Sequence, residues 1–154
     1  MDQKFLYKFS IYIFFLSLFM LFLVPIVGVE IKGSKRWLDL FFLPRLQPVE
    51  FVKPFFIIVL SLILTNEKFL NFSLKFSISL LLTLLIATLL LIQPDLGQTL
   101  LIGLNWVILI FISGVNLIFL STVSLIGVTL LLYIAFFVPK FEYIKNRILS
   151  FLDS

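Results

Sequence analysis

The sequence predicts an all-α fold, a polytopic bundle of about five transmembrane helices. Hydrophobic residues make up 62% of the 154 positions, whereas a soluble domain has about 45–50%. The apolar residues form runs close to the length, about 20 residues, that a helix needs to span a bilayer. Only 13% of the residues are charged, and most of them lie between these runs. These observations indicate an integral membrane protein with room for roughly five spans.

The first span is expected over residues 11–27, where Pro25 and Gly28 favour the end of the helix. Because no small-residue cleavage site follows this run, a retained helix is favoured over a removable signal peptide. Residues 29–46 then form a polar connection. Its charged residues are Glu30, Lys32, Lys35, Arg36, Asp39 and Arg45.

The second span is expected over residues 47–65. Pro48 suits the first helical position, where its missing N–H would have no helical partner in any case. Pro54 falls inside the helix, removes the hydrogen bond to the carbonyl of Glu50 and favours a kink.

Three further spans are expected over residues 74–92, 98–112 and 117–138. After them, residues 139–154 change character, with apolar residues at helical spacing and polar residues on the other faces. The apolar set is Phe141, Ile144, Ile148, Phe151 and Leu152. We therefore expect one partial transmembrane domain over residues 1–154 that ends in an amphipathic helix at the membrane interface.

The composition narrows the possible chemistry. With no Cys and no His in the chain, thiolate nucleophiles, imidazole bases and the usual zinc ligands are excluded. A bound metal would need oxygen ligands, which favours Mg or Mn. The net charge of +4 suits anionic lipid headgroups or a phosphorylated lipid. The alternative is ordinary charge that sets topology, and we expect the membrane, not nucleic acid, to face these cations.

Glu50 and Lys53 are the strongest candidates for a functional site. Residues three apart share one face of a helix, so their charged ends can meet. Charges inside an apolar segment are costly and usually mark function. The alternative is a mutually neutralising pair that holds the helix against a neighbour, but such pairs are weak contributors to stability.

Lys35 and Arg36, beside Trp37, form a second candidate. An Arg fork and a Lys point charge could together hold a pyrophosphate; alternatively, they are snorkelling cations that fix orientation. Asp95 has two readings as well, as a carboxylate stabilised by a helix dipole or as a ligand or proton acceptor. Because two spans separate Glu50 from Asp95, both acids should return to the same side of the membrane as Lys35 and Arg36.

Three polar motifs follow one another in a fixed order: Ile31–Leu38, Gln47–Lys53 and Gln93–Gly97. In residues and order they resemble the SEDS family of membrane glycosyltransferases, the FtsW and RodA proteins, and the resemblance covers essentially the whole chain. The lead-in Gly28–Gly33 and Gln98 look more like the cell-division (FtsW) branch.

Two positions within the motifs depart from the family pattern. Ser34 stands where Ala is usual, and Val49 stands where Ser is usual. The first change is conservative in size. The second removes a hydroxyl, so a group that used it as a partner would lose it.

The resemblance implies a bacterial inner-membrane enzyme that polymerises lipid II into glycan strands and releases undecaprenyl pyrophosphate. It implies Lys35, Arg36 and Lys53 on the phosphate side, with Trp37 and Gln47 in support. A divalent cation is a further expectation. Glu50 and Asp95 would organise the site electrostatically.

Family members have about ten spans, and the acid usually taken as the catalytic base lies in a large extracytoplasmic loop that would begin at this chain's tail. We therefore expect a fragment or a truncated gene product that is inactive alone. The family also implies a class B penicillin-binding protein as partner. Two alternatives stay open: a flippase or transporter for a lipid-linked precursor, and a non-catalytic membrane scaffold.

The family orientation conflicts with simple charge counting. The five expected helices divide the loop cations unequally: Lys4, Lys8, Lys68 and Lys75 on one side, and Lys32, Lys35, Arg36, Arg45, Lys140, Lys145 and Arg147 on the other. The positive-inside rule places the second side in the cytoplasm. The resemblance places it outside, and we follow the resemblance because cations that serve an anionic substrate bias the count.

Overall fold

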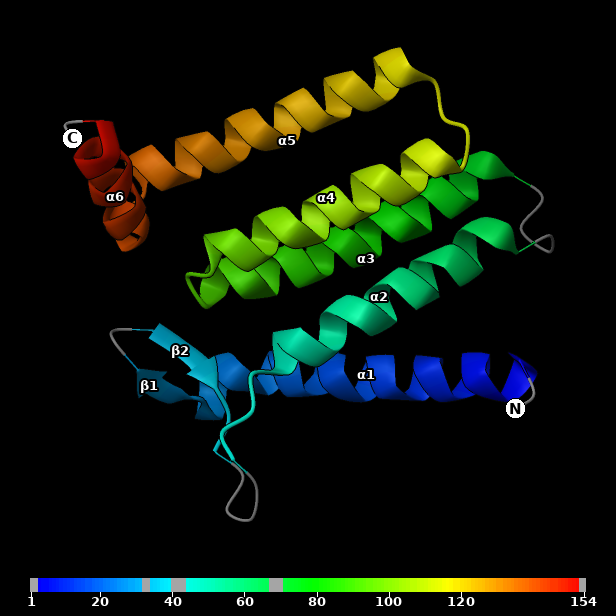
Figure 1. The fold of residues 1–154 in the computed structure, drawn as a ribbon, viewed down its shortest axis with the longest axis horizontal. Coiled ribbons are helices and arrows are strands. Elements are labelled where there is room, and N and C mark those ends of the chain that lie inside the picture. The colour runs from blue at the N-terminus through cyan, green and yellow to red at the C-terminus, as the bar shows by residue number, and fades with distance from the viewer. Residues whose placement is uncertain (1–2, 32–33, 40–43, 67–70, 153–154) are drawn as a thin grey trace. The chain divides into compact units, whose positions relative to one another are not determined.

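The computed structural model describes residues 3–31, 34–39, 44–66 and 71–152, which fall into two compact units, Met1–Ser113 and Gly114–Ser154 (Figure 1). The first unit contains α1 (Gln3–Val27), β1 (Val29–Ile31), β2 (Ser34–Trp37), α2 (Pro48–Thr65), α3 (Phe72–Ile92) and α4 (Leu96–Ile112). The second contains α5 (Leu117–Phe137), the short 3₁₀ helix η1 (Pro139–Phe141) and α6 (Glu142–Leu152). The all-α class is confirmed, whereas the single domain expected over residues 1–154 stays a prediction.

An apolar helix is present in each region where a span was expected, but some of the bounds differ. The helix expected from residue 11 begins at Gln3. In the described residues four helices, α1, α2, α3 and α5, are long and apolar enough to cross a membrane. Helix α4 has 17 residues and a length of about 25 Å, slightly less than a hydrocarbon core of about 30 Å. Four spans and one shorter apolar helix therefore stand where about five spans were expected.

The segment expected as an open connection after α1 contains a small antiparallel hairpin. Strands β1 and β2 pair with Glu30 opposite Lys35 and Ile31 opposite Ser34. Past the hairpin, Leu38 and Leu46 exchange two backbone hydrogen bonds of 2.8 and 3.0 Å, which bring the chain back to the start of α2. Lys32 and Gly33 of the first motif lie outside the described residues.

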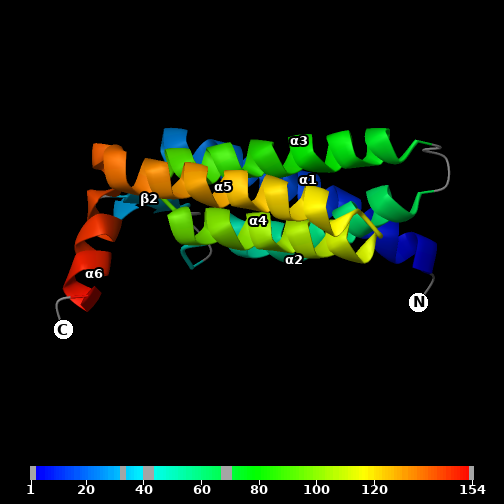
Figure 2. The same ribbon diagram turned by 90° about the horizontal axis from the view of Figure 1, so that it is seen from above.

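The core of the first unit lies between helices that run side by side in both views (Figure 1, Figure 2). Helix α1 packs on α2, and α3 packs on α4, with further contacts from α2 to α3 and α4. The fully buried core side chains recur on one face of each helix and include Phe14, Leu21, Val52, Phe56, Leu60, Ile86, Leu90, Ile102 and Ile110. Between α3 and α4, the buried Trp106 Nε1 donates to Ser79 Oγ at 3.1 Å.

One end of this first unit gathers the polar segments. The β1–β2 hairpin, the start of α2 and the turn between α3 and α4 lie together at the end opposite the N-terminus (Figure 1). This placement follows from the helices' lengths and alternating directions. The three motifs of the sequence therefore meet at one end of the bundle.

In the second unit, the described side chains of η1 and α6 differ in burial, and the amphipathic helix expected there stays a prediction. Phe141 is buried and Ile144 half-buried, whereas Glu142, Lys145 and Asn146 are exposed. The remaining apolar positions of the expected pattern, Ile148, Phe151 and Leu152, carry side chains outside the described residues.

Candidate functional site

The start of α2 holds the predicted charge pair. Gln47 is the N-cap residue and Pro48 opens the helix, as expected, and α2 continues through Pro54. One turn in, Lys53 Nζ lies 2.8 Å from Glu50 Oε2, since residues three apart share a helix face. The Lys53 side chain is 22% exposed and that of Glu50 is 51% exposed. The pair therefore sits at the open edge of the helix bundle.

The turn between α3 and α4 holds the second acid. Asp95 is the N-cap of α4, and its Oδ1 accepts a hydrogen bond of 3.3 Å from the backbone N–H of Gln98. This cap explains why α4 begins at Leu96 and not at the expected residue 98. Asp95 thus lies at a helix N-terminus, as one of the two interpretations of the sequence proposed.

Arg36 reaches this turn from β2. Its Nη1 lies 3.7 Å from Asp95 Oδ2, and its Nη2 and Nε donate to the carbonyls of Pro94 at 2.6 Å and Gln93 at 3.4 Å. Asp95 is the more buried partner, with a side chain that is 10% exposed against 28% for Arg36. The guanidinium therefore spans the whole turn.

Gln98 joins the two charge pairs. From the first turn of α4, its Nε2 donates to Glu50 Oε1 at 3.2 Å, while its backbone N–H donates to Asp95. Its Oε1 is a buried acceptor with no hydrogen-bond partner in the described part of the chain. A continuous polar network thus runs from Arg36 through Asp95, Gln98 and Glu50 to Lys53.

This network contains two cations and two carboxylates, so its formal charge is zero. Each cation lies against a carboxylate, which leaves it less free to bind another anion. Its inner end, at Asp95, is enclosed by the turn, and its outer end, at Glu50 and Lys53, is accessible. A polar headgroup would therefore meet the network at Glu50 and Lys53.

The structure separates Lys35 from Arg36, although the sequence suggested that they act together. They are neighbours on strand β2, and side chains of neighbouring strand residues point to opposite faces. Lys35 is exposed and has no ion pair among the residues that the structure describes. Trp37 on β2 and Gln47 before α2 are both half-buried and close to the network in the chain.

Two glutamines complete the site and were not among the predicted site residues. Gln93 is buried, and its Nε2 donates to the carbonyl of Leu21 in α1 at 3.0 Å. Gln98 makes the bridge to Glu50. Gln93 is the first residue of the Gln93–Gly97 motif and Gln98 directly follows it, so their place in and beside this motif was the available signal.

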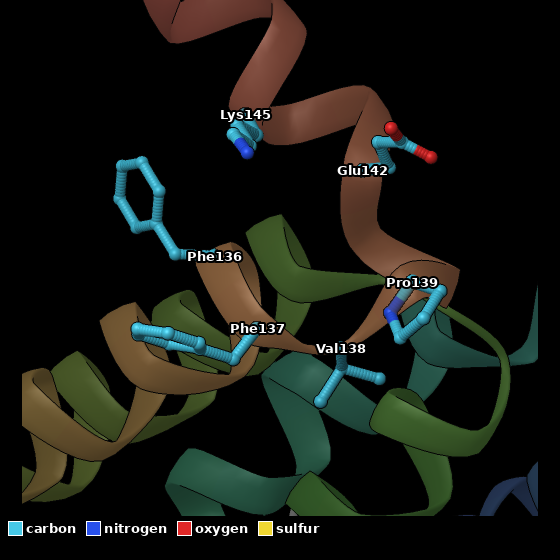
Figure 3. Close-up of a pocket in the computed structure, with 6 residues that line it drawn as sticks. All are labelled: Phe136, Phe137, Val138, Pro139, Glu142 and Lys145. Carbon is cyan, nitrogen blue, oxygen red and sulfur yellow. The ribbon is translucent and has the colours of Figure 1, made fainter.

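The described carboxylates form no cluster of three or more. Within the described ranges, no three acidic side chains gather closely enough to bind an ion, and Glu50 and Asp95 are each paired with a cation. A separate shallow pocket of about 190 Å³ lies in the second unit, between the end of α5 and α6, lined by Phe136, Phe137, Val138, Pro139, Glu142 and Lys145 (Figure 3). It contains none of the predicted site residues.

Comparison with known sequences identifies the family. The family model FTSW_RODA_SPOVE, described as a cell cycle protein, matches residues 1–154. The chain is 34% identical to an FtsW protein of Wigglesworthia glossinidia brevipalpis over 90% of this chain and 36% of that protein. It is 29% identical to an FtsW protein of Cyanophora paradoxa over 92% of this chain and 34% of that protein. Both are named peptidoglycan glycosyltransferases, and the chain spans about a third of their length.

Comparison with solved structures gives the same fold. RodA, the rod shape determining protein of Thermus thermophilus, superimposes with a TM-score of 0.66 and 30% identity, covering 85% of this chain and 43% of RodA. A chain of a peptidoglycan synthase complex that coordinates polymerization and crosslinking gives a TM-score of 0.75 and 30% identity, covering 99% of this chain and 45% of that chain. With its apolar spans and its three motifs at one end of the bundle, the chain belongs to the FtsW/RodA/SpoVE family of cell cycle proteins and is a multi-pass protein of the inner membrane.

Proposed function

We propose that this chain forms a substrate-binding part of a peptidoglycan glycosyltransferase that polymerises lipid II during cell division or elongation. The observation that carries this proposal is the polar network that joins all three motifs at one end of the bundle. The names of the FtsW relatives support the activity. A network of two ion pairs beside apolar spans costs more than a purely structural role requires.

In the proposed reaction, the 4-hydroxyl of the acceptor sugar attacks the anomeric carbon of the growing strand. A new glycosidic C–O bond forms, the bond to the pyrophosphate oxygen breaks, and undecaprenyl pyrophosphate leaves. The hydroxyl proton passes to a general base, which we do not assign to a residue of this chain. Positive charge stabilises the leaving pyrophosphate.

The residues of this chain act on the leaving group and on its orientation. Lys53 at the accessible edge of the network and the exposed Lys35 supply positive charge. Glu50 and Asp95 fix the positions of the cations around them, and Trp37 and Gln47 support the headgroup at the membrane face. The expected Mg or Mn, whose positive charge would add to that of the lysines, stays a prediction.

A class B penicillin-binding protein is the proposed partner. Support comes from the synthase complex, in which a chain of the same fold belongs to an assembly that coordinates polymerization and crosslinking. Crosslinking is the chemistry of a transpeptidase. A partner of this kind would act on the glycan strand that the proposed polymerase makes.

A chimera tests the proposed activity. The segment of the synthase-complex chain that matches this chain would be replaced by residues 1–154, and the chimera would be reconstituted with fluorescent lipid II. We expect glycan polymer from the chimera and at least tenfold less from its Lys53→Gln form, because one charge-assisted hydrogen bond contributes about 1.5 kcal/mol or more. Lys8→Gln, which removes a charge at the other end of the bundle, is the control.

A leaflet-accessibility assay on vesicles that contain the reconstituted chimera distinguishes a polymerase from the alternative, a flippase. A folded chimera that moves lipid II between leaflets without making polymer would replace the polymerase proposal with a flippase. A Lys53→Gln chimera that polymerises as fast as its parent would remove the network from the reaction.

A further inference from the structure

We infer that Arg36 is a positioning residue, which holds the α3–α4 turn and through it Asp95, and that Lys35 is the cation offered to the substrate anion. The role given to Lys35 rests on the proposed function. The role given to Arg36 rests only on contacts within the chain. It reverses the expectation that an Arg fork in this motif binds pyrophosphate.

Three nitrogens of the Arg36 side chain contact oxygens of three successive residues. Nε donates to the Gln93 carbonyl at 3.4 Å, Nη2 donates to the Pro94 carbonyl at 2.6 Å, and Nη1 lies 3.7 Å from Asp95 Oδ2. A guanidinium has five N–H donors in a rigid planar fork. An ammonium, with a single nitrogen, cannot reach three separated acceptors in this way.

The end of α3 favours a cationic partner of this kind. The last carbonyls of a helix have no partner within the helix, and a cation near them is favoured by the helix dipole. Gln93 is already fixed on one side, because its Nε2 donates to the Leu21 carbonyl of α1. Arg36 fixes the turn from the other side, so Asp95 is held between α1 and β2.

Asp95 connects the turn to the rest of the network. It caps α4 through the Gln98 backbone N–H, and the Gln98 side chain donates to Glu50. A displacement of the turn would therefore separate Gln98 from Glu50. Arg36 acts on the Glu50–Lys53 edge through these residues and not by touching it.

The same geometry leaves little of Arg36 for a substrate. Its three nitrogens each already face an oxygen of the turn. Lys35, on the opposite strand face, is exposed and carries no ion pair within the described residues. Of the two adjacent cations, Lys35 is thus the one whose charge no described carboxylate pairs with.

The absence of cysteine from the sequence makes a spin-label test direct. Gly97 in the first turn of α4 is exposed, and a Cβ built there meets only Asp95 Oδ1 within 4 Å, at 4.0 Å. A nitroxide on Gly97→Cys, in the full chain in lipid nanodiscs, reports the mobility of the turn. We expect Arg36→Lys and Arg36→Gln to raise that mobility alike, and the neighbouring Lys35→Gln to leave it unchanged.

Binding of geranylgeranyl pyrophosphate to the same samples gives the second readout. The salt dependence of its affinity reports charges that contact the ligand, and a purely structural role does not alter it. We expect Lys35→Gln to weaken this dependence and both Arg36 variants to retain it. If Arg36→Gln does not fold, Arg36→Lys and Asp95→Asn carry the test, since both keep the size of the side chain.

The inference is overturned if Arg36→Lys keeps the mobility of the parent, or if Arg36→Gln and not Lys35→Gln reduces the salt dependence. Failure of the proposed function can be told apart from failure of the role given to Arg36. If the parent chain shows no binding of the pyrophosphate, the proposed function fails, while the spin-label result still decides the role of Arg36.

Discussion

At the scale of single residues, the two ion pairs of the network differ in environment. Asp95 is 10% exposed beside Arg36, whereas Glu50 is 51% exposed beside Lys53. Exposed pairs contribute about 0–1 kcal/mol, because water screens them and ordering the side chains costs entropy. Removing one partner of a buried pair costs more, since the other charge is left without compensation.

Matched amide substitutions test this difference. Asp95→Asn keeps an N-cap side chain and removes only the charge, and we expect it to lower the free energy of unfolding by about 1–3 kcal/mol. Glu50→Gln should lower it by less than about 1 kcal/mol. Thermal unfolding in detergent, followed by tryptophan fluorescence, gives both values. Equal losses would contradict the assignment of Asp95 to the inner end of the network.

The sequence predicted part of this network. The spacing of Glu50 and Lys53 predicted their contact, and the count of spans predicted that Asp95 would lie at the same end. The Arg36 contacts could not be predicted in this way. They join residues 57 and 58 positions apart in the chain, and they depend on a strand that orients Arg36 away from Lys35.

At the scale of elements, the end of α1 depends on a glycine. Gly28 follows the last residue of α1, and a Cβ placed there would collide with the backbone carbonyl of Val24. The chain must turn at this point into β1, which pairs with β2 and so places Arg36. The start of the hairpin therefore has no room for a side chain.

Two glycine-to-alanine variants test this packing. Gly28→Ala should destabilise the chain by about 1–3 kcal/mol, because a backbone atom must move. Gly103→Ala in α4 is the matched control, since a Cβ there meets nothing within 4 Å and removing a helical glycine stabilises by about 0.5–1 kcal/mol. Opposite signs in denaturant unfolding support the argument; a neutral Gly28→Ala would contradict it.

The apolar runs predicted the helices more accurately than the segments between them. Length and hydropathy determine an apolar helix, so each expected region contains one, although α4 is shorter than the four candidate spans. The hairpin was not predicted, because strands of three and four residues give too few positions for an alternating pattern. The earlier start of α4 reflects the Asp95 cap, a local hydrogen bond that hydropathy does not report.

At the scale of the whole molecule, the motifs and the positive-inside rule imply opposite orientations. The family resemblance puts the hairpin end outside, and charge counting puts it in the cytoplasm. We predict the family orientation. In a chain without cysteine, Glu30→Cys at the hairpin and Asn71→Cys before α3 are exposed, single labelling sites at opposite ends of the first unit.

A membrane-impermeant maleimide applied to intact spheroplasts measures this orientation. We expect Glu30→Cys to react at once and Asn71→Cys to react only after lysis. The reverse pattern would show that the charge count determines the topology. It would also place the polar network on the wrong side of the membrane for lipid II that has already been exported.

The central claim is that the polar network binds the headgroup of a lipid-linked pyrophosphate, and equilibrium binding of lipid II to the full chain in nanodiscs tests it most directly. We predict that Lys53→Gln weakens the affinity about tenfold, as expected for the loss of one charge-assisted hydrogen bond. Lys8→Gln, at the opposite end of the first unit, should bind like the parent. Equal affinities for the parent and Lys53→Gln, or an equal loss in Lys8→Gln, would contradict the claim.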